Sequence, residues 1–425
     1  MKRSIVVFMI CLFVLCAASV AFAAESRTSG LFTYEIKGNG TAVITGYDWE
    51  NHGNGDLYIP NMLDGYTVTG IRDKAFWNYS LDTLEEYIID LYSSEKIMAK
   101  LPESIVTIGE MAFRRCALIK SINIPASVKS IGVGAFAGTD IVCDVDSQND
   151  TYATIDDVLY NKKNRELIFI PTSREKLEVP EGIESVGGYA FYQVEQPDYG
   201  GLTIVFPNTL RHIENYAFSN SRLEDFSFPN SLETIGNSAF ENTIFVKCNK
   251  LIFPSSVNMI GESAFKGLNN HGYNTTPIKE IDLQNTSITT IPVSAFESAQ
   301  IHNILLPNTI KSIGDCAFKN AEWMEVVLQE GVESIGVSAF EGCDIREISL
   351  PSTLKSIGDL AFANVKYLAQ VAIPDNVNAI GENIVDRTKV ALVVTPGSYA
   401  ETWATENGYM IAKQGGDDTS WLNYD

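Results

Sequence analysis

The stretch SIGVSAFEGC, residues 334–343, carries two side chains that could perform covalent chemistry. Gly336, Val337 and Ser338 begin like the G-x-S-x-G turn that exposes a nucleophilic serine. Cys343 places a thiol nearby, and a thiolate is itself a nucleophile. The first question that this sequence raises is therefore whether the stretch belongs to an active site.

Repetition of the same stretch favours a structural role for Ser338. The sequence Gly-x-Ser-Ala-Phe also occurs at residues 236–240 and 261–265, and the second glycine of the nucleophile turn is missing each time. In other copies the serine is replaced, the replacements being Met111, Tyr216, Cys316 and Leu360. A nucleophile needs one base beside it, whereas a repeated sequence indicates repeated architecture. We therefore predict no enzymatic activity and no catalytic residue.

Three other possible sites are also weak. The acidic segment DVDSQND at residues 144–150 could suggest calcium, but it lacks the glycine and glutamate of a calcium loop. The segments LPNTI and LPSTL resemble a sorting signal, but neither has the following glycine. The cysteines after residue 23 (Cys116, Cys143, Cys248, Cys316, Cys343) and the histidines (His52, His212, His271, His302) are scattered. We expect no metal site and no cofactor.

The charge of the chain limits its partners. It has 31 basic and 53 acidic residues, a formal net charge of −22 at pH 7. This charge repels phosphate backbones and anionic lipids, which makes nucleic acid and membrane surfaces poor partners. The acidity could equally serve only to keep an extended monomer soluble.

Residues 1–23 have the features of a secretory signal peptide. Lys2 and Arg3 precede an apolar segment, and Ala21-Phe22-Ala23 forms a small-x-small cleavage site. We predict cleavage between Ala23 and Ala24, which makes the protein secreted or displayed at the cell surface. No later segment is apolar for long enough to insert into a membrane.

A repeat organises the rest of the chain. An Ile-Gly-x-x-Ala-Phe block, with some changes, recurs along it, and the last four copies are spaced by 22 residues. After the first copy, at Phe76, the block places phenylalanines at Phe113, Phe136, Phe191, Phe218, Phe240, Phe265, Phe296, Phe318, Phe340 and Phe362. Between the blocks lie alternating segments that end in proline, such as INIP, FSFP and ISLP. Alternation predicts a strand with one buried face, and proline ends its pairing.

The repeated block predicts a tightly packed corner in each coil. Its phenylalanine would fill the interior, and burial of such a side chain stabilises a fold by about 1.5 to 3 kcal/mol. The glycine is replaced by Glu214 in one copy and by Pro292 in another. Proline fixes φ near −65°, so the glycine indicates close passage of neighbouring chains and not a left-handed turn.

The segments IPASVKSIGVGAF and LPSTLKSIGDLAF resemble the BspA-like leucine-rich repeat family. The resemblance implies a mostly β solenoid of α/β type, a right-handed horseshoe or arc of parallel strands with short helical or 3-10 corners. It also implies that Cys116 and Cys343 are buried, inert thiols, and that the protein adheres to other proteins. We expect amino-terminal capping β coils at 24–70, repeats at 71–395, a capping helix at 396–412 and a flexible acidic tail at 413–425. Ser398 and Glu401 would form the capping box of that helix, and Tyr399, Ala400 and Trp403 its apolar face.

The exposed positions of the proline-terminated strands are the candidate binding surface. They include a column of acids, namely Asp225, Glu280, Asp282, Glu325 and Glu347. Paired with such positions are several apolar ones, among them Val205, Leu305 and Val327. We place this acidic column on the concave sheet, where solenoids bind their partners. Charged residues could also serve there only to prevent aggregation.

The leading hypothesis is a monomeric recognition or adhesion protein that binds extracellular or host proteins. One alternative is a glycan-binding accessory protein, although Trp49, Trp77, Tyr79 and Trp323 form no obvious stacking platform in the sequence. Another alternative is a structural component of a surface layer.

Overall fold

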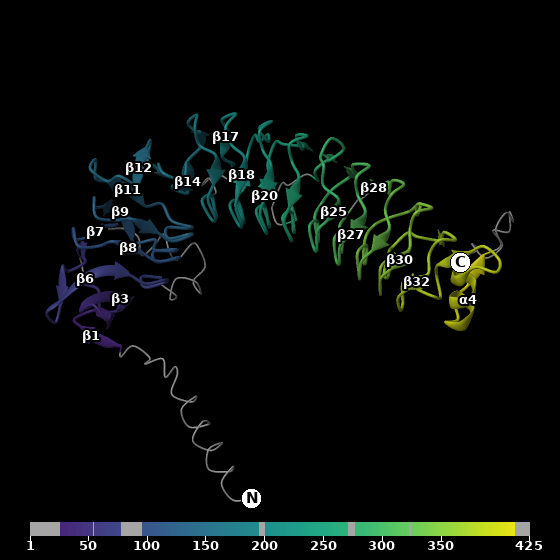
Figure 1. Cartoon of the computed structure of the whole chain (residues 1–425), viewed down its shortest axis with the longest axis horizontal. Coiled ribbons are helices and arrows are strands. Elements are labelled where there is room, and N and C mark those ends of the chain that lie inside the picture. Colours follow the sequence, from purple (N-terminus) through teal and green to yellow (C-terminus); the bar gives the residue numbers. More distant parts are fainter. Residues whose placement is uncertain are drawn as a thin grey trace, which may run out of the picture.

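The computed structural model of the chain is an arc of stacked coils (Figure 1). It describes residues 26–53, 55–77, 96–194, 200–270, 277–322 and 325–412. The predicted solenoid of mostly parallel strands is confirmed. The predicted signal peptide and acidic tail lie outside the described residues, as do Tyr79, His271 and Trp323.

The amino-terminal end of the arc is antiparallel. Strands β1 (Arg27–Ser29), β2 (Phe32–Ile36) and β3 (Thr41–Tyr47) pair in order, and β5 (Met62–Leu63) forms a hairpin with β6 (Tyr66–Ile71). Pairing becomes parallel between β3 and β6, and then between β6 and β8 (Thr107–Ile108). The first strands thus form one edge on which the parallel coils are stacked.

Two ladders of parallel strands run along the arc. The inner ladder is formed by the Ser-Ile segments of the repeat and consists of β8, β10 (Ser130–Ile131), β14 (Glu166–Phe169), β16 (Ser185–Val186), β18 (His212–Ile213), β20 (Thr234–Ile235), β23 (Met259–Ile260), β25 (Thr290–Ile291), β27 (Ser312–Ile313), β29 (Ser334–Ile335), β30 (Ser356–Ile357) and β32 (Ala379–Ile380). The outer ladder is formed mostly by the proline-terminated segments and consists of β4 (Leu57–Tyr58), β7 (Ile97–Lys100), β9 (Ile119–Ile124), β11 (Val142–Val145), β15 (Lys176–Glu178), β17 (Thr203–Val205), β22 (Lys250–Ile252), β24 (Glu280–Asp282), β26 (Asn303–Leu305), β28 (Glu325–Val326), β31 (Gln370–Ala372), β33 (Ala391–Val393) and β34 (Ile411–Ala412).

The prediction that the proline-terminated strands line the concave side is wrong. In Figure 1, β17 and β28 lie toward the outer side of the arc, and β18, β20, β25, β27, β30 and β32 lie toward its inner side. The inner ladder forms sheets of five to seven strands, whereas the outer ladder is divided into sheets of two to four. Neighbouring coils are closer on the inside of an arc, and close spacing keeps the pairing there continuous.

Between the corners and the outer ladder lies a short additional pair of strands, β19 (Arg222–Leu223) and β21 (Ile244–Phe245). The longer gap after Phe136 contains an antiparallel insertion. Strand β12 (Tyr152–Ile155) pairs with β13 (Val158–Asn161), which pairs with β14. The insertion rejoins the repeats when β14 pairs in parallel with β16.

The corner phenylalanines form two buried stacks along the solenoid, one that ends at Phe136 and one that begins at Phe191. None of the ten from Phe113 to Phe362 is more than 1% exposed. The ring centroids of Phe340 and Phe362 are 5.4 Å apart and their planes differ by 8°. Each corner is a turn, and its backbone also joins neighbouring coils, since Phe340 N donates to Ala361 O at 2.8 Å.

Helix α4 (Tyr399–Glu406) ends the inner side of the arc beyond β32 (Figure 1). Ser398 is its N-cap and accepts from Glu401 N at 3.1 Å, while the Glu401 carboxylate accepts from Gly397 N at 2.6 Å. Ala400 and Ala404 are buried. Tyr399 is 45% exposed, so its predicted place on the apolar face is wrong, because the helix turns this residue toward solvent.

Candidate binding surface

The structure places Ser338 in the wall of the solenoid. This residue is 4% exposed, has a φ of 53° and donates its backbone N–H to Asp359 O at 2.8 Å. Equivalent residues in other coils share the left-handed conformation, namely Met111, Tyr189, Tyr216, Ser238, Ser263, Ser294, Cys316 and Leu360. The left-handed backbone conformation at this position therefore recurs in the described corners and is not specific to the coil that contains Ser338.

Cys343 is also buried, and its thiol has a structural partner. Its Sγ lies 2.8 Å from Phe318 O of the preceding coil, to which it donates. Burial raises the pKa of this thiol to about 12, so it stays protonated at neutral pH. A protonated and buried thiol is a poor nucleophile.

The position three residues after the corner phenylalanine is a hydrogen-bond donor in several coils. Cys116 donates to Phe76 O at 2.9 Å, and Thr243 donates to Phe218 O at 2.8 Å. Ser221 makes the same contact with Phe191 O. Sequence reasoning missed this role because cysteine was interpreted only as a small apolar residue. The recurrence of serine, threonine and cysteine at one position was the available signal.

One carboxylate of the acidic segment at 144–150 is paired with lysine side chains. Asp150 lies 2.8 Å from Lys129 Nζ and 3.4 Å from Lys163 Nζ, and the hydrogen bond from Lys129 is the main reason that its pKa is lowered. Asn149 is buried and donates to Pro125 O at 2.8 Å. Across the described ranges, no group of three or more His, Cys, Asp or Glu residues is arranged to hold a metal ion.

The structure brings the central acids of the predicted acidic column together, but with a cation between them. Lys250 Nζ lies 2.5 Å from Glu280 Oε1 and 3.9 Å from Asp282 Oδ2. The hydrogen bond to Glu280 is the main cause of the raised pKa of Lys250. The Glu280 and Asp282 side chains are only 27% and 15% exposed. One lysine therefore offsets part of the negative charge of these two acids within the outer ladder.

The remaining acids of the column are dispersed. Glu325 is exposed on β28, beside Asn303 of β26. Asp225 and Glu347 are exposed but lie outside the named strands. The described structure thus places Glu280, Asp282 and Glu325 in one four-stranded sheet and leaves the other two acids apart from it.

Exposed apolar side chains lie among these acids on the outer ladder. Val205 is 51% exposed, Ile252 54% and Val327 65%. Ile252 is in register with Asp282, which is in register with the half-buried Leu305, so apolar and acidic side chains alternate there from coil to coil. The sequence contains these positions in its exposed pairs, but only the register between coils shows which of them are neighbours.

The inner ladder exposes mainly hydroxyl groups, and some of its side chains bond to one another. Thr290 Oγ1 and Ser312 Oγ are 2.9 Å apart, as are His212 Nδ1 and Thr234 Oγ1. Ion pairs between successive coils form at the residue just before these strands, with Lys355 Nζ 2.6 Å from Glu333 Oε2. This face is polar, and some of its polar groups already bond to neighbouring coils.

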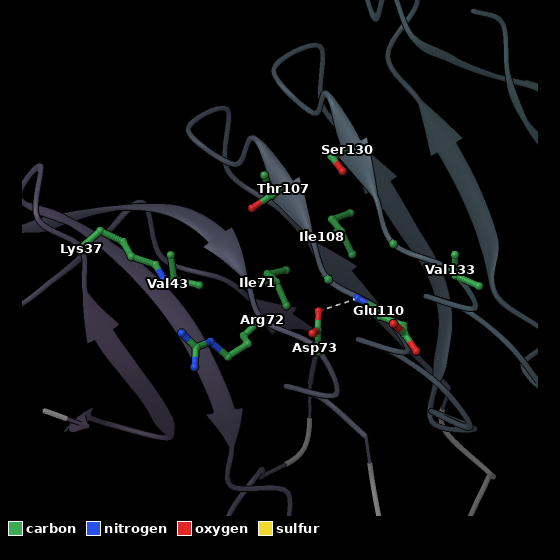
Figure 2. A pocket seen from close by; sticks show the side chains of 12 residues that line it. Lys37, Val43, Ile71, Arg72, Asp73, Thr107, Ile108, Glu110, Ser130 and Val133 are labelled. Carbon is green, nitrogen blue, oxygen red and sulfur yellow. Dashed lines mark hydrogen bonds between the residues drawn. The ribbon is translucent and has the colours of Figure 1, made fainter. Parts of the chain in front are cut away.

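An open pocket lies where the inner ladder meets β3 (Figure 2). Two of its charged side chains already have partners. Arg72 makes two hydrogen bonds to Glu35, at 3.0 and 2.6 Å. Asp73 Oδ1 accepts from Glu110 N at 2.8 Å, the contact drawn in Figure 2. A ligand in this pocket would have to compete with these contacts of Arg72 and Asp73.

The model of the BspA type leucine rich repeat region matches this chain at residues 69–177, 162–288 and 289–402. The chain belongs to the BspA type leucine-rich repeat family. No helix in the part of this repeat protein that the structure describes is long and apolar enough to cross a membrane.

Several solved structures are similar to this leucine-rich repeat chain. A leucine rich cell surface protein from Faecalibacterium prausnitzii has 18% identity and a TM-score of 0.40, with 94% of this chain and 97% of that chain covered. A leucine-rich repeat protein from Bacteroides ovatus has 21% identity and a TM-score of 0.42, with 91% and 99% covered. The pneumococcal vaccine antigen PcpA has 18% identity and a TM-score of 0.38, with 92% and 99% covered. No curated protein matches the chain.

Proposed function

We propose that this chain is a secreted or cell-surface protein that recognises another protein through its outer ladder, without enzymatic activity. The observation that carries the proposal is the exposure of apolar side chains on the outer ladder, where Val205, Ile252 and Val327 are each at least half exposed. Solvent-exposed apolar side chains on a rigid solenoid form a contact surface for a partner.

The charges among the exposed apolar side chains of the outer ladder favour a particular kind of partner. Glu325 is exposed next to Val327, and the chain as a whole has a net charge of −22. A partner that presents apolar side chains with basic residues around them would complement this surface and associate faster at low salt. Adhesion to extracellular or host proteins fits this chemistry and the predicted secretion signal.

The inner ladder offers less to a protein partner. Some of its hydroxyl groups and charges already bond to neighbouring coils, as at Thr290 and Ser312. A partner would have to replace those contacts to gain new ones, with little net free energy. We therefore place recognition on the outer and not the inner side of the arc.

The test is binding of the mature chain to a panel of purified extracellular proteins, followed by variants. Ile252→Thr and Val327→Thr keep a β-branched side chain and remove apolar surface. We expect each to lower the affinity for the captured partner about tenfold, a loss of about 1.4 kcal/mol. Met259, which is 52% exposed on the inner ladder, provides the matched control as Met259→Thr.

Two outcomes would contradict the proposal. Unchanged affinity in both outer-ladder variants would show that this surface does not contact the partner. A loss of affinity confined to Met259→Thr would show the same. Glu325→Gln tests the charge separately and should weaken binding less at high salt than at low salt, because salt screens exposed charges.

A further inference from the structure

A cluster of aromatic side chains surrounds one arginine at the corners of the solenoid. We call it the corner cluster, and its members are Trp77, Arg114, Tyr189, Tyr192 and Tyr216. Trp77, Arg114 and Tyr192 each follow a corner phenylalanine directly. Tyr189 and Tyr216 occupy the left-handed corner position, with φ of 60° and 59°. Stacking of coils thus brings residues that are distant in sequence to one edge of the arc.

Arg114 is held between aromatic rings. Its guanidinium carbon lies 5.1 Å from the Trp77 ring centroid, 5.7 Å from that of Tyr189 and 4.7 Å from that of Tyr192. Its Nη2 donates to the Tyr192 hydroxyl at 2.9 Å. Cation–π contacts of this kind fix the position of a guanidinium group while leaving its charge uncompensated.

No carboxylate pairs with Arg114 in the part of the chain that the structure describes. Its Nη1 donates to the thioether sulfur of Met111, at 3.5 Å. Many other described cations are paired with acids, as Lys250 is with Glu280 and Lys319 with Glu341. A thioether is a weak acceptor, so Nη1 keeps the capacity to bind a stronger, anionic acceptor.

Two glycines in the intervening coil make room for the cluster. A Cβ on Gly134 would lie 3.2 Å from the Tyr189 ring, and one on Gly138 would lie 2.8 Å from Gln193 Oε1. Both glycines have positive φ, at positions where other coils carry residues such as Ser338 and Asn320. Because these two glycines have no side chains, side chains of the coils on either side can approach each other.

The cluster also presents an exposed aromatic face. The Tyr189 and Tyr216 rings stack with centroids 4.8 Å apart and planes 9° apart, and Tyr216 is 36% exposed. Stacked tyrosines next to a cation suit a ligand with an apolar face and a nearby negative charge. A sugar ring that bears a carboxylate has both features.

We propose that the corner cluster binds an acidic saccharide, whose ring packs against Tyr216 and whose carboxylate accepts hydrogen bonds from Arg114. This site lies apart from the outer ladder and does not depend on the proposed recognition of proteins there. The ligand is a carboxylate-bearing sugar, because a neutral sugar would leave the arginine charge without a partner.

The test uses the mature chain and an array of sialylated, uronate-containing and neutral oligosaccharides, followed by titration calorimetry. Sialyllactose and lactose form a matched pair of ligands if the array selects sialic acid. We expect binding of the acidic member of such a pair and about tenfold weaker binding of the neutral one. Arg114→Gln and Tyr216→Leu should each weaken acidic-sugar binding about tenfold.

Tyr399→Leu is the control, since Tyr399 is 45% exposed on α4, outside the cluster. Thermal unfolding checks that each variant is folded, and Tyr216→Leu keeps the test decisive if Arg114→Gln is unstable. The proposal is overturned if no acidic saccharide on the array binds, if neutral sugars bind equally well, or if Tyr216→Leu binds as tightly as the parent chain.

Discussion

At the scale of single residues, the corner glycine is required by close passage of the neighbouring coil. A Cβ on Gly336 would lie 2.4 Å from Asp315 Oδ1 and 2.7 Å from Asp315 N. The glycine does not have a positive φ, so the expectation of tight passage is confirmed. Glu214 and Pro292, which replace this glycine in two coils, follow coils in which the residue corresponding to Asp315 is Gly188 or Glu262.

Gly336→Ala should therefore destabilise the protein. The added methyl group must displace backbone of the preceding coil, and such overpacking costs about 1 to 3 kcal/mol. The measurement is urea unfolding followed by circular dichroism. Gly38→Ala is the matched control, because a Cβ there meets nothing within 4 Å. Equal stability of Gly336→Ala and the control would refute close passage as the reason for the glycine.

Phe340 and Ser338 are neighbours with different expected roles. Phe340→Ala removes a ring that is 0% exposed and stacks between Phe318 and Phe362, and we expect a loss of about 3 to 5 kcal/mol. Ser338→Ala keeps the backbone and removes only a hydroxyl, so its unfolding free energy should change by less than about 1 kcal/mol. A Phe340→Ala variant as stable as the parent would contradict the stacked core.

The raised pKa of the Cys343 thiol predicts that the folded protein is less stable at alkaline pH. Burial raises the pKa of its thiol from 9.0 to about 12, so the unfolded chain loses this proton at lower pH than the folded chain. The thiol contribution to the free energy of unfolding is fully present below about pH 9 and declines as the pH rises toward about 12. Cys343→Thr keeps a hydroxyl donor, as Thr243 shows, but does not titrate there.

Urea unfolding across that pH range measures the difference. The parent chain should lose stability more steeply with rising pH than Cys343→Thr does. Parallel pH profiles for the two chains would show that the thiol is not shielded in the folded state.

At the scale of the repeated coil, side chains of one coil bond to the backbone of the next. Asp315 Oδ1 accepts from Val337 N at 2.7 Å, and Asp359 Oδ1 accepts from Glu382 N at 2.7 Å. Asn215 and Asn237 make the corresponding contact in earlier coils. These acceptors satisfy backbone N–H groups that the corner turn leaves without a ladder partner.

Much of the coil could be predicted from its sequence, because its period, strands and buried phenylalanine follow from hydrophobic patterning. The left-handed corner position could not, since Met111, Tyr216 and Leu360 do not favour positive φ. Packing of the surrounding coil imposes that conformation. The pairing of Lys250 with Glu280 also depends on the register between strands that an insertion separates.

At the scale of the whole molecule, the direction of the curve decides which surface faces outward. Each repeat contains two segments that can form strands, and the sequence does not state on which of them the coils are closer together. Curvature is the sum of small differences in spacing over many coils. The expectation that solenoids bind partners on the concave sheet puts the acidic column there, whereas Figure 1 shows β28, which carries Glu325, toward the outer side.

The central claim is that the outer ladder contacts the partner, and hydroxyl-radical footprinting of the complex tests it most directly. We predict that binding protects Ile252, Leu305 and Val327 from oxidation and leaves Met259 of the inner ladder as reactive as in the free chain. Protection of Met259 together with unchanged oxidation of Ile252 and Val327 would contradict the claim.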